Sequence, residues 1–167
     1  MSDERDDDRT IEVLVEIPKG SRNKYEMDHE RHVMRLDRRL LSATTYPADY
    51  GYLPNTLSGD GDPLDALILL DEPTFPGCLV AARPVGVFWM EDEKGPDAKI
   101  ICFVARDPLW DHVRDIDQLP AAVRSEIEHF FEVYKALEKK KTSTHGFEGV
   151  DAAWKEIEAS RGRASGP

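Results

Sequence analysis

Hydrophobic and polar residues alternate at the start of the chain in the way that a half-buried strand requires. Every second residue of segment 11–17 is aliphatic, and Pro18 follows as a turn residue. Five further strands are expected at residues 24–27, 33–36, 66–70, 79–90 and 99–105. The longest of them, 79–90, is interrupted near Pro84 and Gly86. Turn residues separate these strands at short intervals, which favours an antiparallel barrel or sandwich over a βαβ repeat.

Helical periodicity appears only in the last third of the chain. Asp117 and Pro120 are typical of a cap and a first turn. The apolar positions after them form one helix face, which consists of Val123, Ile127, Phe130, Phe131, Tyr134 and Leu137. A shorter helix is expected at 150–159, with Trp154 and Ile157 on its inner side. Strands therefore precede helices, which predicts a small β-barrel flanked by helices.

The length of the chain is that of one ordinary domain. It has 167 residues, of which 40% are hydrophobic, and this is enough to build one core. We expect a disordered acidic tail at 1–9, a single domain at 10–160 and a frayed end at 161–167. No apolar stretch approaches the roughly 18 residues of a membrane span, and the acidic start does not resemble a secretory signal. A cytoplasmic location is the expectation.

The net charge of −11 disfavours binding to nucleic acid or to an anionic membrane. It does not disfavour a small phosphorylated substrate, because bound divalent cations reverse the sign of a carboxylate-rich pocket. Cys78 and Cys102 each lie among apolar neighbours, where buried thiols are common. Neither a disulfide framework nor a cysteine-based zinc site is indicated.

Three carboxylates fall within six residues in the segment from Asp60 through Asp62 to Asp65. The electrostatic repulsion between these carboxylates is acceptable on a water-exposed turn. Alternatively, the carboxylate oxygens hold hard cations such as Mg²⁺ between them. Asp65 directly precedes the buried run 66–70, so one charge lies beside a low-dielectric core, where it is costly without a partner. An EF-hand is excluded because Asp65 stands where its sharp turn needs glycine.

Two other segments carry candidate chemistry. Residues 90–99 form a second acidic stretch, which alone predicts a solvated hairpin turn but together with the first could close a multi-metal site. Segment 45–52 is rich in tyrosine, and it is either a rigid loop packed on the barrel or a source of hydroxyl groups for oxyanions. Lys24 and Glu26 alternate along a strand and so share a face.

Seven motifs together resemble the soluble family I inorganic pyrophosphatases of bacterial type. They are DGDPLDAL (60–67), EIPKGSRNKYEMD (16–28), LDR (36–38), YPADYGY (46–52), RPVGV (83–87), EDEKGPDAK (91–99) and HFFEVYKALE (129–138). They occur in family order over most of the chain, which makes the set far more specific than any single motif. The implied fold is α+β with a mainly β core, a five-stranded OB-like closed barrel flanked by a long and a short α-helix.

The resemblance also implies a metal site. Its six ligand positions match Asp60, Asp65, Asp97, Asp92, Glu16 and Glu26. Of these, Asp60, Asp65 and Asp97 hold the principal metal, Asp92 joins Asp97 at a metal that arrives with substrate, and the two glutamates orient metal-bound water or a fourth ion. The implied cofactor is Mg²⁺, several ions per site, with Mn²⁺ or Zn²⁺ as possible substitutes.

The implied reaction is the hydrolysis of pyrophosphate to two orthophosphates by direct in-line attack of a metal-bridged water. Asp62 accepts the proton of that water and belongs to the catalytic set with Tyr50, Lys24 and Arg38. The residues that hold phosphate oxygens are Lys24, Arg38, Tyr50, Lys99, Tyr134 and Lys135. Lys141 is not carried over, because the chain has a run of lysines after Glu138 where relatives often have glycine. A homo-oligomer, a hexamer in bacterial members, is implied as well.

Two alternatives from the binding class remain. One is a catalytically silent OB-type module that uses its acidic loops for Ca²⁺ or Mg²⁺ and a barrel face for a partner. The other, a barrel for single-stranded nucleic acid, conflicts with the negative charge and lacks a basic groove interleaved with aromatic residues.

Overall fold

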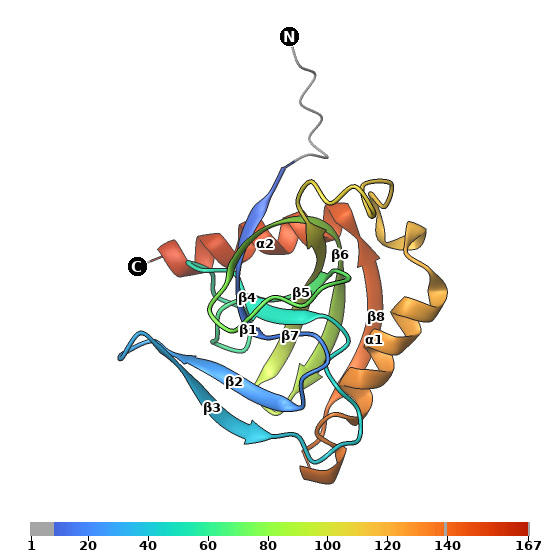
Figure 1. Ribbon diagram of the computed structural model, residues 1–167. Helices are drawn as coiled ribbons and strands as arrows, with labels where there is room; N and C mark the ends of the chain where they lie inside the picture. Colours follow the sequence, from blue (N-terminus) through green and yellow to red (C-terminus); the bar gives the residue numbers. More distant parts are fainter. Residues whose placement is uncertain (1–8, 139, 167) are drawn as a thin grey trace.

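The computed structural model describes residues 9–138 and 140–166 (Figure 1). The expected acidic tail therefore lies, apart from Arg9, outside the described residues. The strands are β1 (Ile11–Ile17), β2 (Asn23–Asp28), β3 (Val33–Arg39), β4 (Asp49–Tyr52), β5 (Asp65–Leu69), β6 (Leu79–Asp92), β7 (Gly95–Val104) and β8 (Ser143–Gly149). The helices are α1 (Ala121–Val133) and α2 (Val150–Ser165), with short 3-10 turns η2 (Ile116–Gln118) and η3 (Ala136–Glu138).

Five strands close into a ring in the order β1-β4-β5-β7-β6, because β6 also pairs with β1. This ring, accompanied by two helices, confirms the predicted OB-like architecture. β6 pairs with β1 over 79–82 and then with β8 over 86–91, so β8 lies along the part of β6 beyond Ile11, where β1 begins. β2 and β3 form a separate two-stranded sheet that projects from one side of the ring in Figure 1.

Side chains of the ring strands feed two hydrophobic clusters. Alternate residues point to opposite faces of a strand, so Leu67 joins one cluster and Ile68 the other. β5 and β7 pair in parallel, and their buried runs on both faces are typical of parallel strands. α1 adds Phe130 and Phe131 to the first cluster, whereas α2 adds Ile157 to the second.

The helix lengths differ from the prediction. α1 has 13 residues and ends at Val133, because Tyr134 already caps it and Leu137, 67% exposed, has no apolar surface to cover. The expectation that Tyr134 lies within this helix is therefore wrong. α2 has 16 residues and is the longer helix, so positions 161–165 are helical rather than frayed. Its last turns are held by Arg163, whose Nη1 donates to Glu156 at 3.1 Å and to the Leu57 carbonyl at 2.9 Å.

Two strands are absent from the prediction. The sequence pattern predicts neither β4, which lies in the tyrosine-rich segment 45–52, nor β8. β6, in contrast, is one continuous strand in which the expected interruption is a shift of register between Pro84 and Gly86. Cys78 and Cys102 are free thiols, the second fully buried. Within the described ranges, no helix combines the length and apolar character that crossing a membrane demands.

Candidate metal and phosphate site

One cavity of about 450 Å³ is lined by all thirteen residues that the sequence singled out. They are Glu16, Lys24, Glu26, Arg38, Tyr50, Asp60, Asp62, Asp65, Asp92, Asp97, Lys99, Tyr134 and Lys135. They come from elements far apart in sequence: the end of β1, the β2–β3 hairpin, β4, the turn before β5, the β6–β7 hairpin and the segment after α1. The fold thus gathers acidic, cationic and phenolic groups around a single space.

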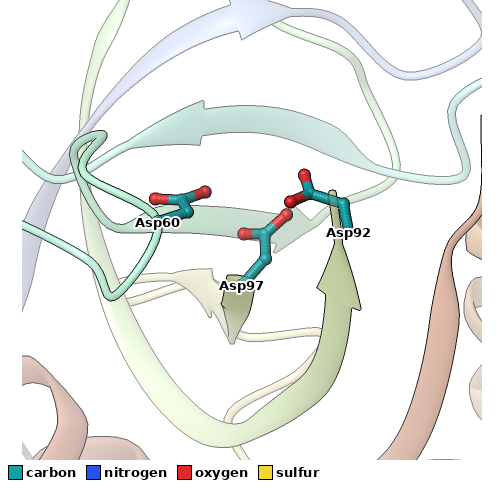
Figure 2. A group of neighbouring side chains, drawn as sticks. All are labelled: Asp60, Asp92 and Asp97. Carbon is teal, nitrogen blue, oxygen red and sulfur yellow. The ribbon is translucent and has the colours of Figure 1, made fainter. Parts of the chain in front are cut away.

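Three acidic side chains lie close enough to share a cation. One carboxylate oxygen each of Asp60, Asp92 and Asp97 lies within 4.8 Å of the other two (Figure 2). Figure 2 shows Asp60 on its loop, Asp92 at the end of β6 and Asp97 on β7, with their carboxylates turned toward a common space. In this structure Asp65, which the sequence grouped with Asp60 and Asp97, instead places its Oδ2 against the ammonium group of Lys99.

Asp97 supplies the clearest sign that this group fits a cation. Its side chain is nearly buried, and its Oδ1 has no hydrogen-bond partner, although a buried carboxylate oxygen without one is costly. Burial raises the pKa of Asp97 to about 6, against the opposing influence of Lys99. Carboxylate oxygens are the ligands that hard divalent cations prefer, so the donor set and the orphaned oxygen both suit Mg²⁺.

Lys99 is the central cation of the site. It is 2% exposed, and its Nζ donates to Tyr50 Oη at 2.7 Å, Asp65 Oδ2 at 2.8 Å and Asp97 Oδ2 at 2.7 Å. Burial acts to lower the pKa of Lys99, but Asp65, Tyr50 and Asp97 outweigh it and hold the pKa well above its ordinary value. Lys99 therefore stays charged and holds two carboxylates beside one phenol.

The other cationic groups line the same cavity from the β2–β3 hairpin and from the segment after α1. Lys24 Nζ donates to Glu26 at 2.6 Å, which confirms that these two residues share a face, and it also approaches Asp37 at 3.4 Å. Burial lowers the pKa of Lys135. These side chains can supply several positively charged donors to one polyanion.

Glu16 joins the acidic side of the cavity to the hairpin. The backbone N–H of Met27 donates to its Oε2 at 2.8 Å, linking β1 to β2. Burial raises the pKa of Glu16 to about 7, because this hydrogen bond only partly offsets desolvation and the nearby Asp65 adds like charge. In the absence of a cation, ionising Glu16 is therefore costly at neutral pH.

Some cavity residues were missed by the sequence interpretation. Lys94, at the β6–β7 turn, places its Nζ 3.4 Å from Asp62 Oδ2, and both side chains are largely exposed. Lys140 lines the cavity, whereas Lys141 does not belong to its lining. Both Lys94 and Lys140 lie in runs of charged residues, where no local pattern indicates which side chains face the cavity. His29 also lines the cavity and packs edge-on against Tyr52.

Comparison with known proteins adds a consistent set of similarities. The family model described as inorganic pyrophosphatase matches residues 13–165. The inorganic pyrophosphatase of Methanosarcina mazei is 52% identical over 157 residues, which is 93% of each chain. The crystal structure of inorganic pyrophosphatase from Thermus thermophilus has a TM-score of 0.92 at 45% identity, over 99% of this chain and 95% of that one. That from Helicobacter pylori has a TM-score of 0.93 at 43% identity, over 99% of both chains.

Proposed function

Because the chain belongs to the inorganic pyrophosphatase family, we propose that it hydrolyses inorganic pyrophosphate to two orthophosphate ions with the help of Mg²⁺. The observation that carries the proposal is the shared cavity, in which acidic oxygens suited to cations and cationic donors suited to phosphate line one space. Hydrolysis of a diphosphate needs both, since the attacked phosphorus is surrounded by negative oxygens.

The residues that would hold the metal are Asp60, Asp92 and Asp97, with Asp65 as a further ligand once Lys99 shares its hydrogen bonds with substrate. When bound, divalent cations supply charge stabilisation for phosphate oxygens and lower the pKa of a coordinated water. The orphaned Oδ1 of Asp97 supports this assignment. We propose several Mg²⁺ ions per site, with Mn²⁺ or Zn²⁺ as substitutes, and assign Glu16 and Glu26 to the water around them.

The proton of the attacking water passes to Asp62 in our proposal. Asp62 is the exposed carboxylate of the turn before β5, and its backbone N–H donates to Asp60 Oδ1 at 3.0 Å, which fixes it beside a metal ligand. Among the described residues, its side chain is paired only with Lys94, whose Nζ lies at the long distance of 3.4 Å from Oδ2. A loosely paired carboxylate retains the free oxygen that a general base needs.

Cationic and phenolic side chains would hold the two phosphoryl groups. Lys24, Arg38 and Lys135 supply positive charge, and Tyr50 and Tyr134 supply hydroxyl groups. Lys99 is already bonded to Tyr50, so both can present to the same phosphate oxygen. Positioning by fixed donors lets the water approach in line with the leaving phosphate and needs no covalent phosphoenzyme.

We further propose that the chain from residue 10 to the end of α2 at Ser165 forms a single pyrophosphatase domain. We also propose that the protein works in the cytoplasm as a homo-oligomer, a hexamer as the family resemblance implies. The negative net charge supports a small metal-complexed substrate over nucleic acid or an anionic membrane surface.

The direct test is phosphate release from pyrophosphate, tripolyphosphate and ATP by the purified protein, each with Mg²⁺ and with EDTA. We expect rapid release from pyrophosphate with Mg²⁺, much slower release from the longer substrates and none with EDTA. Release that continues in EDTA would contradict the metal requirement. Binding of Mg²⁺ without any phosphate release would favour a catalytically silent binding module.

A further inference from the structure

Glu138 lies at the end of the segment that follows α1, and none of the roles assigned above includes it. It forms a two-point pair with Arg38, a residue 100 positions earlier in the chain. We propose that Glu138 is a positioning residue that aims the guanidinium group of Arg38 at the substrate phosphate. This inference rests on the proposed hydrolysis of pyrophosphate.

The geometry of the pair is the bidentate fork typical of arginine and carboxylate. Arg38 Nε donates to Glu138 Oε1, and Arg38 Nη2 donates to Oε2 at 3.0 Å. The Glu138 side chain is only 10% exposed and that of Arg38 28%, so the pair is better shielded from water than an ordinary surface ion pair. The hydrogen bond from Arg38 lowers the pKa of Glu138, which keeps its carboxylate ionised.

Counting donors shows which part of Arg38 remains for substrate. A guanidinium group has five N–H bonds. Glu138 takes two of them along the Nε side, and Asp37 takes one from Nη1. Within 9–138 and 140–166, one N–H on each terminal nitrogen has no partner, and Arg38 lines the cavity. Glu138 therefore fixes the guanidinium plane from one side and leaves its outer end for a phosphate oxygen.

The pair also joins two parts of the fold that carry different phosphate-binding groups. Arg38 belongs to the β2–β3 sheet, which is separate from the main ring, and Lys24 lies on the same sheet. Glu138 follows Tyr134 and Lys135 after the end of α1. The bond between Arg38 and Glu138 thus holds the hairpin in register with the groups after α1, so that both sets face one substrate.

Steady-state kinetics with Mg²⁺ and pyrophosphate test this role, using Glu138→Gln, Arg38→Ala and the double variant. We expect Glu138→Gln to raise KM about tenfold and to change kcat less, because one charge-assisted contact is misaligned rather than lost. Glu138→Asp keeps the charge, so it should recover part of this loss. In the Arg38→Ala background, Glu138→Gln should have no further effect. Glu126→Gln, an exposed change on α1, is the matched control.

Each outcome bears on the positioning role. A KM that is unchanged or lowered in Glu138→Gln would overturn it, the latter because Glu138 would then compete with substrate for Arg38. An equal loss in the wild-type and Arg38→Ala backgrounds would overturn it too. If Glu138→Gln does not fold by thermal melting, Glu138→Asp takes its place, with a smaller rise in KM expected and an unchanged KM contradicting the role. An inactive wild type would instead contradict the proposed function.

Discussion

At the scale of single residues, charge compensation explains how so many carboxylates share one cavity. Lys99 pairs with two of them, and Lys94 approaches a third at the mouth. Asp97 keeps one oxygen without a partner, so the compensation is incomplete. The sequence placed these carboxylates near one another from their motifs, but the Lys99 contacts depend on the parallel pairing of β5 with β7, which sets Asp65 opposite Lys99.

Replacing Asp62 tests its proposed role as the proton acceptor. We expect Asp62→Asn to reduce kcat by about 100-fold or more, because general-base catalysis contributes roughly that factor. The variant should remain folded, since Asp62 is exposed and its backbone bond to Asp60 does not need the charge. Phosphate release and a thermal melt measure the two effects. Asp117→Asn, outside the cavity, is the control, and a kcat for Asp62→Asn near that of the control would contradict the assignment.

A second comparison concerns Lys140 and Lys141, two of the three lysines that follow η3. Lys140 lines the cavity and Lys141 does not. We expect Lys140→Ala to raise KM for pyrophosphate by about threefold to fivefold, the size of a partly exposed charge contact, and Lys141→Ala to leave KM almost unchanged. The same kinetic assay measures both variants. A larger effect at Lys141 would mean that the segment after η3 adopts a different course during catalysis.

Among the strands and helices, the local sequence pattern predicts an element correctly where buried and exposed residues alternate with a simple period. β1 has the bounds that the sequence pattern predicts, because one face is apolar and Pro18 ends it. β8 has no such pattern and includes Gly146 in the left-handed region, so it is a strand only because β6 offers an unpaired edge beyond β1. β4 is likewise set by its partners on both sides, β1 and β5. Tertiary pairing of this kind is not visible in a local sequence pattern.

Because β4 packs closely against β1, we expect a side chain at position 51 to destabilise the fold. A Cβ at this position would lie 2.0 Å from the carbonyl oxygen of Leu14, which is backbone and cannot move aside. Gly51→Ala should therefore destabilise the protein by several kcal/mol, about as much as the larger core defects, or prevent folding. Gly162→Ala, within α2 and with open space around it, should instead stabilise by about 0.5–1 kcal/mol. Urea unfolding measures both, and equal stability of the two variants would contradict the pairing.

In the whole molecule, the ring of strands and the β2–β3 hairpin bring the thirteen predicted site residues, which lie between Glu16 and Lys135 in the sequence, to one cavity. The ordered motifs allowed these residues to be named from the sequence. The motifs do not predict the break between α1 and η3 or the position of Lys140 at the cavity. Both depend on how the segment after α1 packs against the β2–β3 hairpin.

Burial of acidic groups predicts how the stability of the metal-free protein depends on pH. The pKa of Glu16 is raised from 4.5 to about 7 in the folded state, so the folded protein favours the protonated carboxyl group. The free energy of unfolding is therefore highest, as far as Glu16 is concerned, below pH 4.5, and it falls as the pH rises to about 7. The loss is about 3 kcal/mol at most. Unfolding in EDTA at pH 5 and pH 8 should show it, and Glu16→Gln should flatten the dependence. An equally steep profile in that variant would contradict the assignment.

The carboxylates of Asp60, Asp92 and Asp97 are the proposed ligands of the cation on which hydrolysis depends. Calorimetric titration of Mg²⁺ into the substrate-free protein and into Asp97→Asn tests this assignment most directly. We expect saturable binding to the wild type and an affinity at least about tenfold lower in the variant, because a neutral amide replaces the buried charged ligand. Equal Mg²⁺ affinity in the two proteins would contradict it.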